Sequence, residues 1–462
     1  MEGEGDKWQQ LCDEDVALNI PLIGAEHEGS NGHNNNVTTS FLKTCFNGLN
    51  ALSGYSIDEE KFIASQPSDK NTVSFFRTCL NGLNSISGVG ILSVPYALAS
   101  GGWLSLALLF SIAAVAFYSG ILMKRCMEKN SNIRTYPDIG ELAFGKTGRL
   151  IVSISMYTEL YLVSIGFLIL EGDNLSNLFP IEEFQVVGLS IGSKHFFVIL
   201  VALIILPTIW LDNLSLLSYV SASGVFASII IILSISWTGA FDGVGFDQKG
   251  DIVNLNGIPT AVSLYAFCYC AHPVFPTLYN SMRNKHQFSN VLIVCFIITT
   301  IGYASMAIIG YLMFGSKVDP QVTLNLPLNK ISSRIAIYTT LVNPITKFAL
   351  MATPITNALK DLLPMTYKNN KVTNIIVSTI LVISTVIVAL SVPFFGSLMS
   401  LVGAFLSVTA SILLPCLCYL RISGTYRKFG FETFVIVVII LVAIVMGISG
   451  TYTSLVEIVK IL

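Results

Sequence analysis

Long apolar segments recur along almost the whole chain and decide its class before any motif is considered. A helix needs about 20 apolar residues to cross roughly 30 Å of hydrocarbon. Soluble proteins carry about 25% charged residues, whereas this chain is 53% hydrophobic and only 12% charged. The sequence therefore predicts an all-α membrane protein. The eleven predicted transmembrane helices span residues 77–100, 103–126, 149–172, 194–211, 214–240, 258–281, 287–314, 331–360, 372–392, 394–421 and 430–453.

The distribution of charge predicts an orientation and two regions. With a cytoplasmic N-terminus, the loops on the cytoplasmic side hold fourteen Lys and Arg, and the far side with the C-terminal end holds six. Basic residues favour the cytoplasmic side, so we expect the C-terminus on the far, luminal side. Residues 1–70 hold twelve Asp and Glu against four Lys. That composition predicts a disordered acidic cytoplasmic tail, followed by an eleven-span domain at 71–462.

Several functional classes lack their sequence signatures. The sequence contains no GxxxxGK[ST] loop and no TVGYG filter, which argues against an ATP-driven pump and a potassium channel. The nine cysteines form no CxxC pair, and no nucleophile–base pair or metal cluster is evident. We therefore expect no enzyme activity, metal, cofactor or nucleic-acid partner.

Two predicted spans carry breaks typical of secondary transporters. Span 1 contains NSISGVGILSVP, and span 6 contains YAFCYCAHPVFP. Proline removes a backbone N–H, and glycine tolerates non-helical angles. Secondary transporters bind substrate where two such helices meet in corresponding halves of the fold. About five spans separate the two breaks, which predicts two inverted five-helix repeats and one extra helix.

The breaks suggest how a zwitterion is held. Unwinding at residues 88–90 exposes N–H groups at the start of a half-helix, where an α-carboxylate is favoured. Freed carbonyls can accept hydrogen bonds from an ammonium group. The alternative is that these Gly and Pro residues only kink the helices or permit close packing.

Three ionisable side chains lie deep in predicted spans, where such residues usually mark functional sites. Glu159 lies about ten residues into span 3, roughly 15 Å from its end. Lys347 is similarly deep in span 8, and His272 sits at the break of span 6. Histidine has an unperturbed pKa of about 6.5, and a desolvated carboxylate binds a proton more readily. Both suit proton coupling. Alternatively, His272 only bonds a freed carbonyl, and Glu159 and Lys347 form a static charge pair.

Four sequence blocks resemble a known family. They are NGLNSISGVGILSVPYALASGGW, RTYPDIGELAFGKTGR, YLVSIGFLILEGDNL and YAFCYCAHPVFPTLYNSM. Together they are similar to plant and fungal vacuolar amino-acid transporters of the amino acid/auxin permease family, in the amino acid–polyamine–organocation superfamily. The resemblance runs from about Ser74 to the C-terminus. It implies the leucine-transporter fold and a carrier that moves neutral amino acids, usually coupled to protons.

The resemblance also implies a set of site residues. Asn84 matches a position that looks like a sodium ligand in sodium-coupled relatives, where a span 8 hydroxyl helps to hold the ion. We hypothesise that Lys347 places its ammonium in or near that ion site, so that sodium is unnecessary. The candidate proton-coupling residues are instead taken from their depth in the spans, and they are His272, Glu159 and Lys347. The implied substrate-binding residues are Asn84, Ser87, Gly88, Val89, Gly90, Ile91, Phe267, Tyr269, Cys270, Ala271 and His272.

Three functions remain open at this point. The first is a secondary active transporter that moves neutral amino acids across the vacuolar membrane by alternating access, as a proton antiporter. The second is a plasma-membrane importer of the same fold. The third is a sensor that binds amino acids without moving them, which counterflow into proteoliposomes would distinguish. The expected partners are an amino acid, protons and membrane lipid, and we expect a monomer.

A partial copy of span 1 lies just upstream of it. SFLKTCFNGLN begins at Ser40 and SFFRTCLNGLN at Ser74, and ten of fifteen positions match between residues 40–54 and 74–88. The copy cannot span a membrane, because SIDEEK follows it. It is a remnant of exon duplication, a short amphipathic helix on the membrane or carrier surface, or a plug that mimics the first half-helix.

The plug alternative predicts the effect of a truncation. If residues 40–54 dock in the cytoplasm-facing vestibule, deleting residues 1–70 should raise the initial rate of amino-acid uptake about twofold or more. The measurement is uptake into vesicles at matched protein abundance. A deletion of residues 1–35, which keeps the copy, serves as the control. Unchanged or lower uptake in the longer deletion would rule out the plug.

Overall fold

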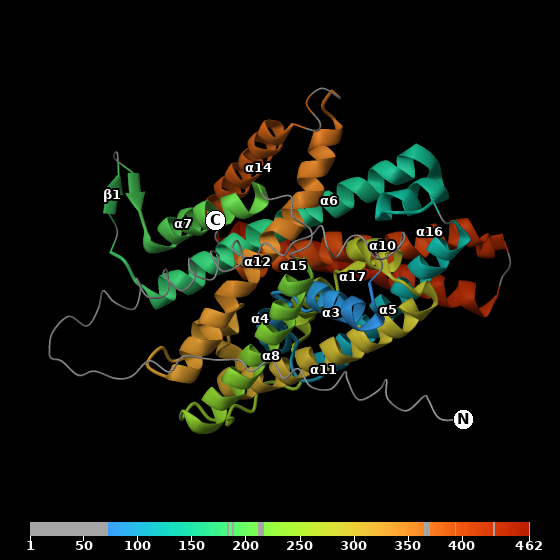
Figure 1. Cartoon of the computed structure of the whole chain (residues 1–462). Coiled ribbons are helices and arrows are strands. Elements are labelled where there is room, and N and C mark those ends of the chain that lie inside the picture. The colour runs from blue at the N-terminus through green and yellow to red at the C-terminus, as the bar shows by residue number, and fades with distance from the viewer. Residues whose placement is uncertain are drawn as a thin grey trace, which may run out of the picture. The chain divides into compact units, whose positions relative to one another are not determined.

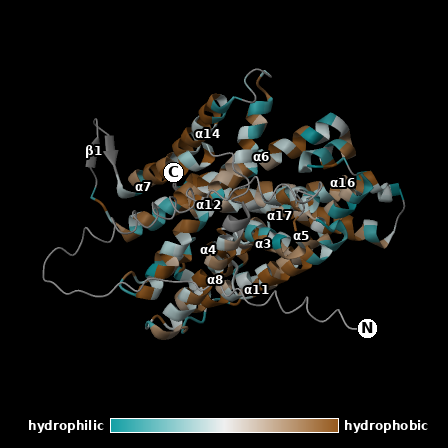
Figure 2. Cartoon of the chain, in the orientation of Figure 1, coloured by the Kyte–Doolittle hydropathy of each residue, from teal (hydrophilic) through white to brown (hydrophobic). Residues whose placement is uncertain are grey.

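The computed structural model describes residues 73–130, 132–182, 184–186, 189–210, 217–364, 367, 370–392, 394–427 and 430–461. The tail and its partial copy at 40–54 lie outside these residues. Within them, ten helices are long and apolar enough to cross a membrane, or eleven if a bent pair counts as one span. This confirms the prediction of an eleven-helix membrane protein. Figure 2 shows apolar residues covering most of these helices, with hydrophilic residues nearer their ends.

The first five spans follow the predicted order. Span 1 is a broken pair of helices, and span 3 is unusually long. The elements are α3 (Phe75–Ile86), α4 (Gly90–Gly101), α5 (Ser105–Lys129), α6 (Tyr136–Leu178), α7 (Ser193–Trp210) and α8 (Leu217–Phe241). A small antiparallel hairpin of β1 (Phe184–Val186) and β2 (Leu189–Ile191) joins α6 to α7, with Gln185 opposite Ser190. The sequence analysis did not predict this hairpin.

The second five spans and the extra helix complete the chain. Span 6 is again broken, and span 10 contains two stretches of π-helix. The elements are η3 (Leu255–Gly257), α9 (Ile258–Cys268), η4 (His272–Val274), α10 (Phe275–Ser281), η5 (Lys285–Gln287), α11 (Phe288–Phe314), η6 (Gly315–Lys317), η7 (Val322–Asn325), α12 (Ile331–Asp361), α14 (Lys371–Ser391), α15 (Phe395–Leu401), η8 (Val402–Ser407), η9 (Thr409–Leu413), α16 (Leu414–Ser423), η10 (Thr425–Arg427) and α17 (Phe431–Ile461).

The packing of the two broken spans is similar in the two halves. The first half-helix of span 1, α3, packs against span 5 (α8), and the first half-helix of span 6, α9, packs against η8 of span 10. Helix α11 packs against both α3 and α4, and α4 packs against α9. Figure 1 shows α3 among α8 and α11 in the middle of the bundle. The fold is therefore the inverted five-plus-five arrangement, with α17 as the extra helix.

Span 3 differs from its predicted bounds. Helix α6 begins at Tyr136, 13 residues before the predicted start at residue 149. A carboxylate at the third position can cap the first backbone amides of a helix, and Asp138 Oδ2 accepts from the Thr135 amide at 2.8 Å. The helix then bends at Gly145, whose φ of 66° suits glycine. The sequence signal for the early start of α6 was a capping box rather than an apolar run.

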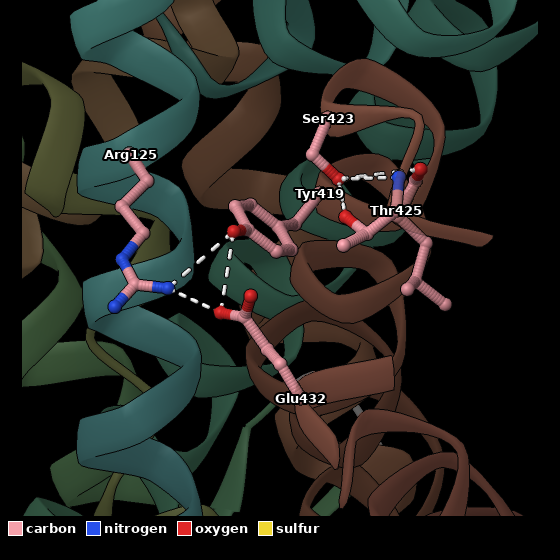
Figure 3. Close-up of polar contacts among 6 residues, drawn as sticks. Arg125, Tyr419, Ser423, Thr425 and Glu432 are labelled. Carbon is pink, nitrogen blue, oxygen red and sulfur yellow. Dashed lines mark hydrogen bonds and ion pairs between the residues drawn. The ribbon is translucent and has the colours of Figure 1, made fainter. Parts of the chain in front are cut away.

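A polar cluster joins three helices at one end of the bundle. Arg125 of α5, Tyr419 of α16 and Glu432 of α17 form the network drawn in Figure 3. The Arg125 guanidinium donates to Tyr419 Oη at 3.4 Å and is paired with the Glu432 carboxylate. Tyr419 Oη also donates to Glu432 Oε1 at 3.3 Å. The cluster attaches the extra helix to spans 2 and 10.

The close approach of α11 and α4 depends on a glycine. A Cβ at Gly310 would lie 2.6 Å from Cβ and Cγ of Pro95. Gly302, two turns earlier on the same helix, has only Ile232 Cδ1 nearby, at 3.7 Å. Any side chain at 310 must therefore push α11 away from the second half of span 1.

We expect Gly310→Leu to destabilise the protein by about 1–3 kcal/mol through overpacking, whereas Gly302→Leu should change stability little. The measurement is the thermal unfolding midpoint of each purified variant in detergent. Equal midpoints for the two variants would contradict the assigned contact.

Candidate substrate site

The break in span 1 is a tight turn between two half-helices. Helices α3 and α4 meet at 49°. Ser87 has φ −71° and ψ 69°, and the Gly88 amide donates to the Ile86 carbonyl at 2.7 Å. These are the values of an inverse γ-turn. Because Gly90 has no side chain, α9 can pack closely against it; a Cβ there would lie 3.2 Å from Cys268 Cα.

The break in span 6 has a similar local geometry. Helix α9 ends at Cys268, and the Ala271 amide donates to the Tyr269 carbonyl at 3.0 Å, again across two residues. Pro273 and Pro276 follow in η4 and α10, where their missing N–H groups prevent a regular continuation. The structure therefore confirms both breaks that the Gly and Pro positions predicted.

A tyrosine joins the ends of the two broken helices. Tyr303 of α11 is 1% exposed, and its hydroxyl lies 2.6 Å from the Ile86 carbonyl oxygen and 3.1 Å from the Cys268 carbonyl oxygen. These are the last residues of α3 and α9. The hydroxyl thus satisfies carbonyls that lose their helical partners at the breaks.

A cavity of about 60 Å³ lies beside the two breaks. That volume holds a few water molecules, so an amino acid can enter only if neighbouring groups move. The lining comes from spans 1, 3, 6, 7 and 8 and is largely apolar. It consists of Asn84, Ser85, Ile86, Gly88, Val89, Gly90, Glu159, Leu160, Val163, Phe167, Phe267, Cys268, Cys270, Ala271, Pro273, Val274, Tyr303, Lys347 and Met351.

Both deep charged side chains line this cavity. The Lys347 ammonium donates to the Ser87 carbonyl at 2.8 Å, and Glu159 Oε1 accepts from the Ser407 hydroxyl at 2.6 Å. Glu159 Oε2 is buried without a hydrogen-bond partner in the described part of the chain. No ion pair within 4.0 Å joins Glu159 to Lys347 among the described residues, so the static charge pair is not present.

His272 lies away from the cavity, against span 2. Its ring is fully buried, with Nε2 3.0 Å from the Ala116 carbonyl oxygen and 2.8 Å from the Ser119 hydroxyl. Ser119 in turn donates to the Ser411 carbonyl of η9 at 2.6 Å. His272 therefore connects η4 to α5 and, through Ser119, to span 10. This arrangement matches the alternative in which the histidine bonds a backbone carbonyl.

Most of the residues implied as substrate-binding gather at the cavity. Seven of the eleven line it: Asn84, Gly88, Val89, Gly90, Phe267, Cys270 and Ala271. The four outside the lining are Ser87, Ile91, Tyr269 and His272. Ser87 nevertheless presents its carbonyl to Lys347. Tyr269 instead directs its hydroxyl to Thr300 of α11, at 3.0 Å.

Sequence reasoning missed several groups at this site. Tyr303 and Ser407 sit in apolar spans with no local motif, and each acts on a partner far away in the chain. Cys268, Phe167 and Met351 line the cavity as ordinary apolar residues. Among the described residues, no group of three or more His, Cys, Asp or Glu side chains could hold a metal ion.

Comparisons with known proteins agree with this architecture. The family model of the transmembrane amino acid transporter proteins matches residues 71–454. Amino acid transporter AVT1I of Arabidopsis thaliana is 58% identical over 422 residues, covering 91% of this chain and 96% of the relative. Amino acid transporter AVT1J of the same plant is 59% identical over 440 residues, covering 95% of this chain and 96% of the relative.

A solved structure supports the fold at low sequence identity. The outward-open, substrate-bound Na⁺-coupled sialic acid symporter superposes with a TM-score of 0.51 at 12% identity, covering 84% of this chain and 90% of that one. The fold is thus the leucine-transporter fold. The chain belongs to the transmembrane amino acid transporter family. It is a multi-pass amino-acid transporter and not an enzyme.

Proposed function

We propose that this chain exchanges protons for neutral amino acids across the vacuolar membrane by alternating access. The observation that carries the proposal is the meeting of Glu159 and Lys347 at one cavity beside two helix breaks. A carboxyl that can bind a proton and a lysine held at a freed carbonyl there would allow coupling to protons without a metal ion.

The breaks supply complementary groups for a zwitterion. Val89 and Gly90 lie at the N-terminus of α4, where backbone amides and the helix dipole favour a carboxylate. The carbonyls at the ends of α3 and α9 favour the ammonium. The remaining lining includes Leu160, Val163 and Met351, which suits an uncharged side chain.

Lys347 is suited to replace a coupling metal ion. Freed carbonyls at a helix break are the groups that coordinate sodium in sodium-driven carriers. Here the Lys347 ammonium already donates to one of them, that of Ser87. Because Lys347 is on span 8 and Ser87 on span 1, this bond joins two helices that should move relative to each other during transport.

Glu159 is the better candidate than His272 for the coupling proton. Its Oε2 lacks a partner and the side chain faces the cavity, so a proton can be gained or lost as access changes. The Nε2 of His272 is already held by Ala116 and Ser119. Its Nδ1 also lacks a partner among the described residues, but the ring is not part of the cavity lining. Protonation of Glu159 would also alter its bond to Ser407, which ties span 3 to span 10.

The alternating movement follows from these links. In the substrate-free form, spans 1, 6 and 7 are joined through Tyr303. We expect these spans to rock with span 2 against spans 3, 4, 8 and 9. The orientation that the charge distribution favours has a cytoplasmic N-terminus and a luminal C-terminus. The vacuolar location rests on the resemblance of the sequence blocks, and a plasma-membrane importer is the second candidate.

Proteoliposomes with an imposed pH gradient and no sodium test the proposal. We expect the gradient to stimulate uptake of neutral amino acids by the unmodified protein. Glu159→Gln should abolish the stimulation, because the amide keeps an acceptor for Ser407 but cannot exchange a proton. The ratio of uptake with and without the gradient should fall to about one.

Two further variants make this test specific. Glu128→Gln removes a carboxylate that pairs with Lys124 at 3.2 Å outside the cavity, and should leave the ratio unchanged. His272→Gln should also retain the stimulation. The assignment of Glu159 is wrong if His272→Gln loses the stimulation and Glu159→Gln keeps it.

A second prediction concerns Lys347. Lys347→Met keeps most of the side-chain volume but leaves the Ser87 carbonyl without its donor, so sodium-free uptake should fall at least tenfold. Lys194→Met removes a lysine that is paired with Asp173 at 2.5 Å. Sodium-free uptake by this variant should fall less than twofold. Uptake is measured in choline and in sodium buffers. Transport by the unmodified protein that requires sodium and ignores pH would disprove the role of Lys347.

A further inference from the structure

The hydroxyl of Tyr303 lies where two helix ends converge. Its oxygen is within 3.1 Å of both the Ile86 and the Cys268 carbonyl oxygens. Each carbonyl ends a half-helix and carries part of the negative charge of the helix C-terminus. One point in the cavity wall is therefore within hydrogen-bond distance of two such carbonyls.

That point suits an ammonium group better than a phenol. A phenol is neutral and has one proton to share between two acceptors, whereas an ammonium has three donors and a positive charge. Hydrogen bonds from a charged donor are roughly twice as strong as neutral ones. An ammonium nitrogen at the position of the Tyr303 oxygen would bond both carbonyls at once.

The other freed carbonyl at the span 1 break is also occupied by a side chain. The Ser87 carbonyl accepts from the Lys347 ammonium. The cavity of about 60 Å³ beside these groups is too small for an amino acid unless something yields. The carbonyls that would recognise an ammonium are thus covered by donors from the protein itself.

We propose that Tyr303 is an internal competitor of the substrate. Its hydroxyl holds the place of the substrate ammonium in the substrate-free carrier and releases the Ile86 and Cys268 carbonyls when an amino acid binds. This inference rests on the proposed substrate site between the two breaks. The competition keeps a hydroxyl donor at the two helix ends, of which the Ile86 carbonyl also accepts from the Gly88 amide, and it lowers substrate affinity.

The neighbouring ring contacts are consistent with a phenol that shifts with its helix. Tyr303 packs edge-on against Tyr269, with ring centroids 5.6 Å apart. Tyr269 in turn bonds Thr300 of the same helix α11. A movement of α11 would therefore carry the Tyr303 ring and shift its hydroxyl relative to the Ile86 carbonyl of α3.

The test is equilibrium binding of radiolabelled L-alanine, L-leucine and L-glutamine to the purified full-length protein. Tyr303→Phe leaves the two carbonyls without the hydroxyl, so binding of an ammonium-bearing ligand should tighten at least fivefold. Propionate, which lacks the amino group of L-alanine, should compete no better than before. Net uptake should slow, because the substrate-free form loses its internal donor.

Tyr311→Phe is the matched control. Tyr311 is on the same helix and fully buried, and its hydroxyl accepts from the Asp251 amide at 2.7 Å outside the cavity. The affinity of the Tyr311→Phe variant for all three amino acids should equal that of the unmodified protein. If Tyr303→Phe binds the amino acids equally or more weakly while the control is normal, Tyr303 is a fixed brace and the inference is wrong.

A second measurement covers the case in which Tyr303→Phe does not fold. Placing 3-fluorotyrosine at position 303 keeps the hydroxyl, and its ¹⁹F resonance should shift on addition of L-alanine but not of propionate. An unshifted resonance in protein that binds L-alanine would overturn the inference alone. An unmodified protein that binds no amino acid would overturn the inference and the proposed function together.

Discussion

The hydrogen bonds that Tyr303 and Lys347 donate to the backbone hold the centre of the bundle together. Hydrocarbon offers no water to pair with a carbonyl, so a broken helix is tolerated only where other groups satisfy it. Tyr303 bonds the last carbonyls of α3 and α9, and Lys347 bonds the carbonyl of Ser87. In the proposed mechanism the same groups also form the site, because their donors lie at the carbonyls that would bind the charged ligand.

The links across the cavity explain how charge and movement can be coupled. Tyr303 joins spans 1, 6 and 7, whereas Lys347 and Glu159 each reach from one span to another, at Ser87 and Ser407. In the proposed mechanism, a change of charge on Glu159 would alter a bond between spans 3 and 10. Binding at the breaks would alter bonds between spans 1, 7 and 8. Substrate and proton would thus act on different contacts of one small cavity.

The breaks and the deep charges were predictable because their signals are local. Glycine and proline determine where a helix ends, and Glu159 and Lys347 stand out in apolar spans. Tyr303 was not predictable, because its partners are 217 and 35 residues away and its span carries no motif. The direction of the His272 side chain could not be predicted from the sequence either. An unwound turn changes the direction in which the following side chains point. The start of α6 was not predicted, because it is set by a capping box in a polar segment rather than by an apolar run.

The burial of α3 bears on the partial copy upstream. The residues of α3 that are buried are Thr78, Cys79, Gly82, Leu83, Asn84 and Ile86. The first five are identical in the copy, and the sixth is replaced by the similar Leu52. Three of the other four substitutions fall at Phe76 and Arg77, which are exposed, and at Ser85, which is half-buried. A remnant without function would not be expected to keep the face that packs on α8 and α11. We propose from this pattern that the copy can take the place of α3, as the plug alternative requires; the remnant and the surface helix are the other two predictions for this segment.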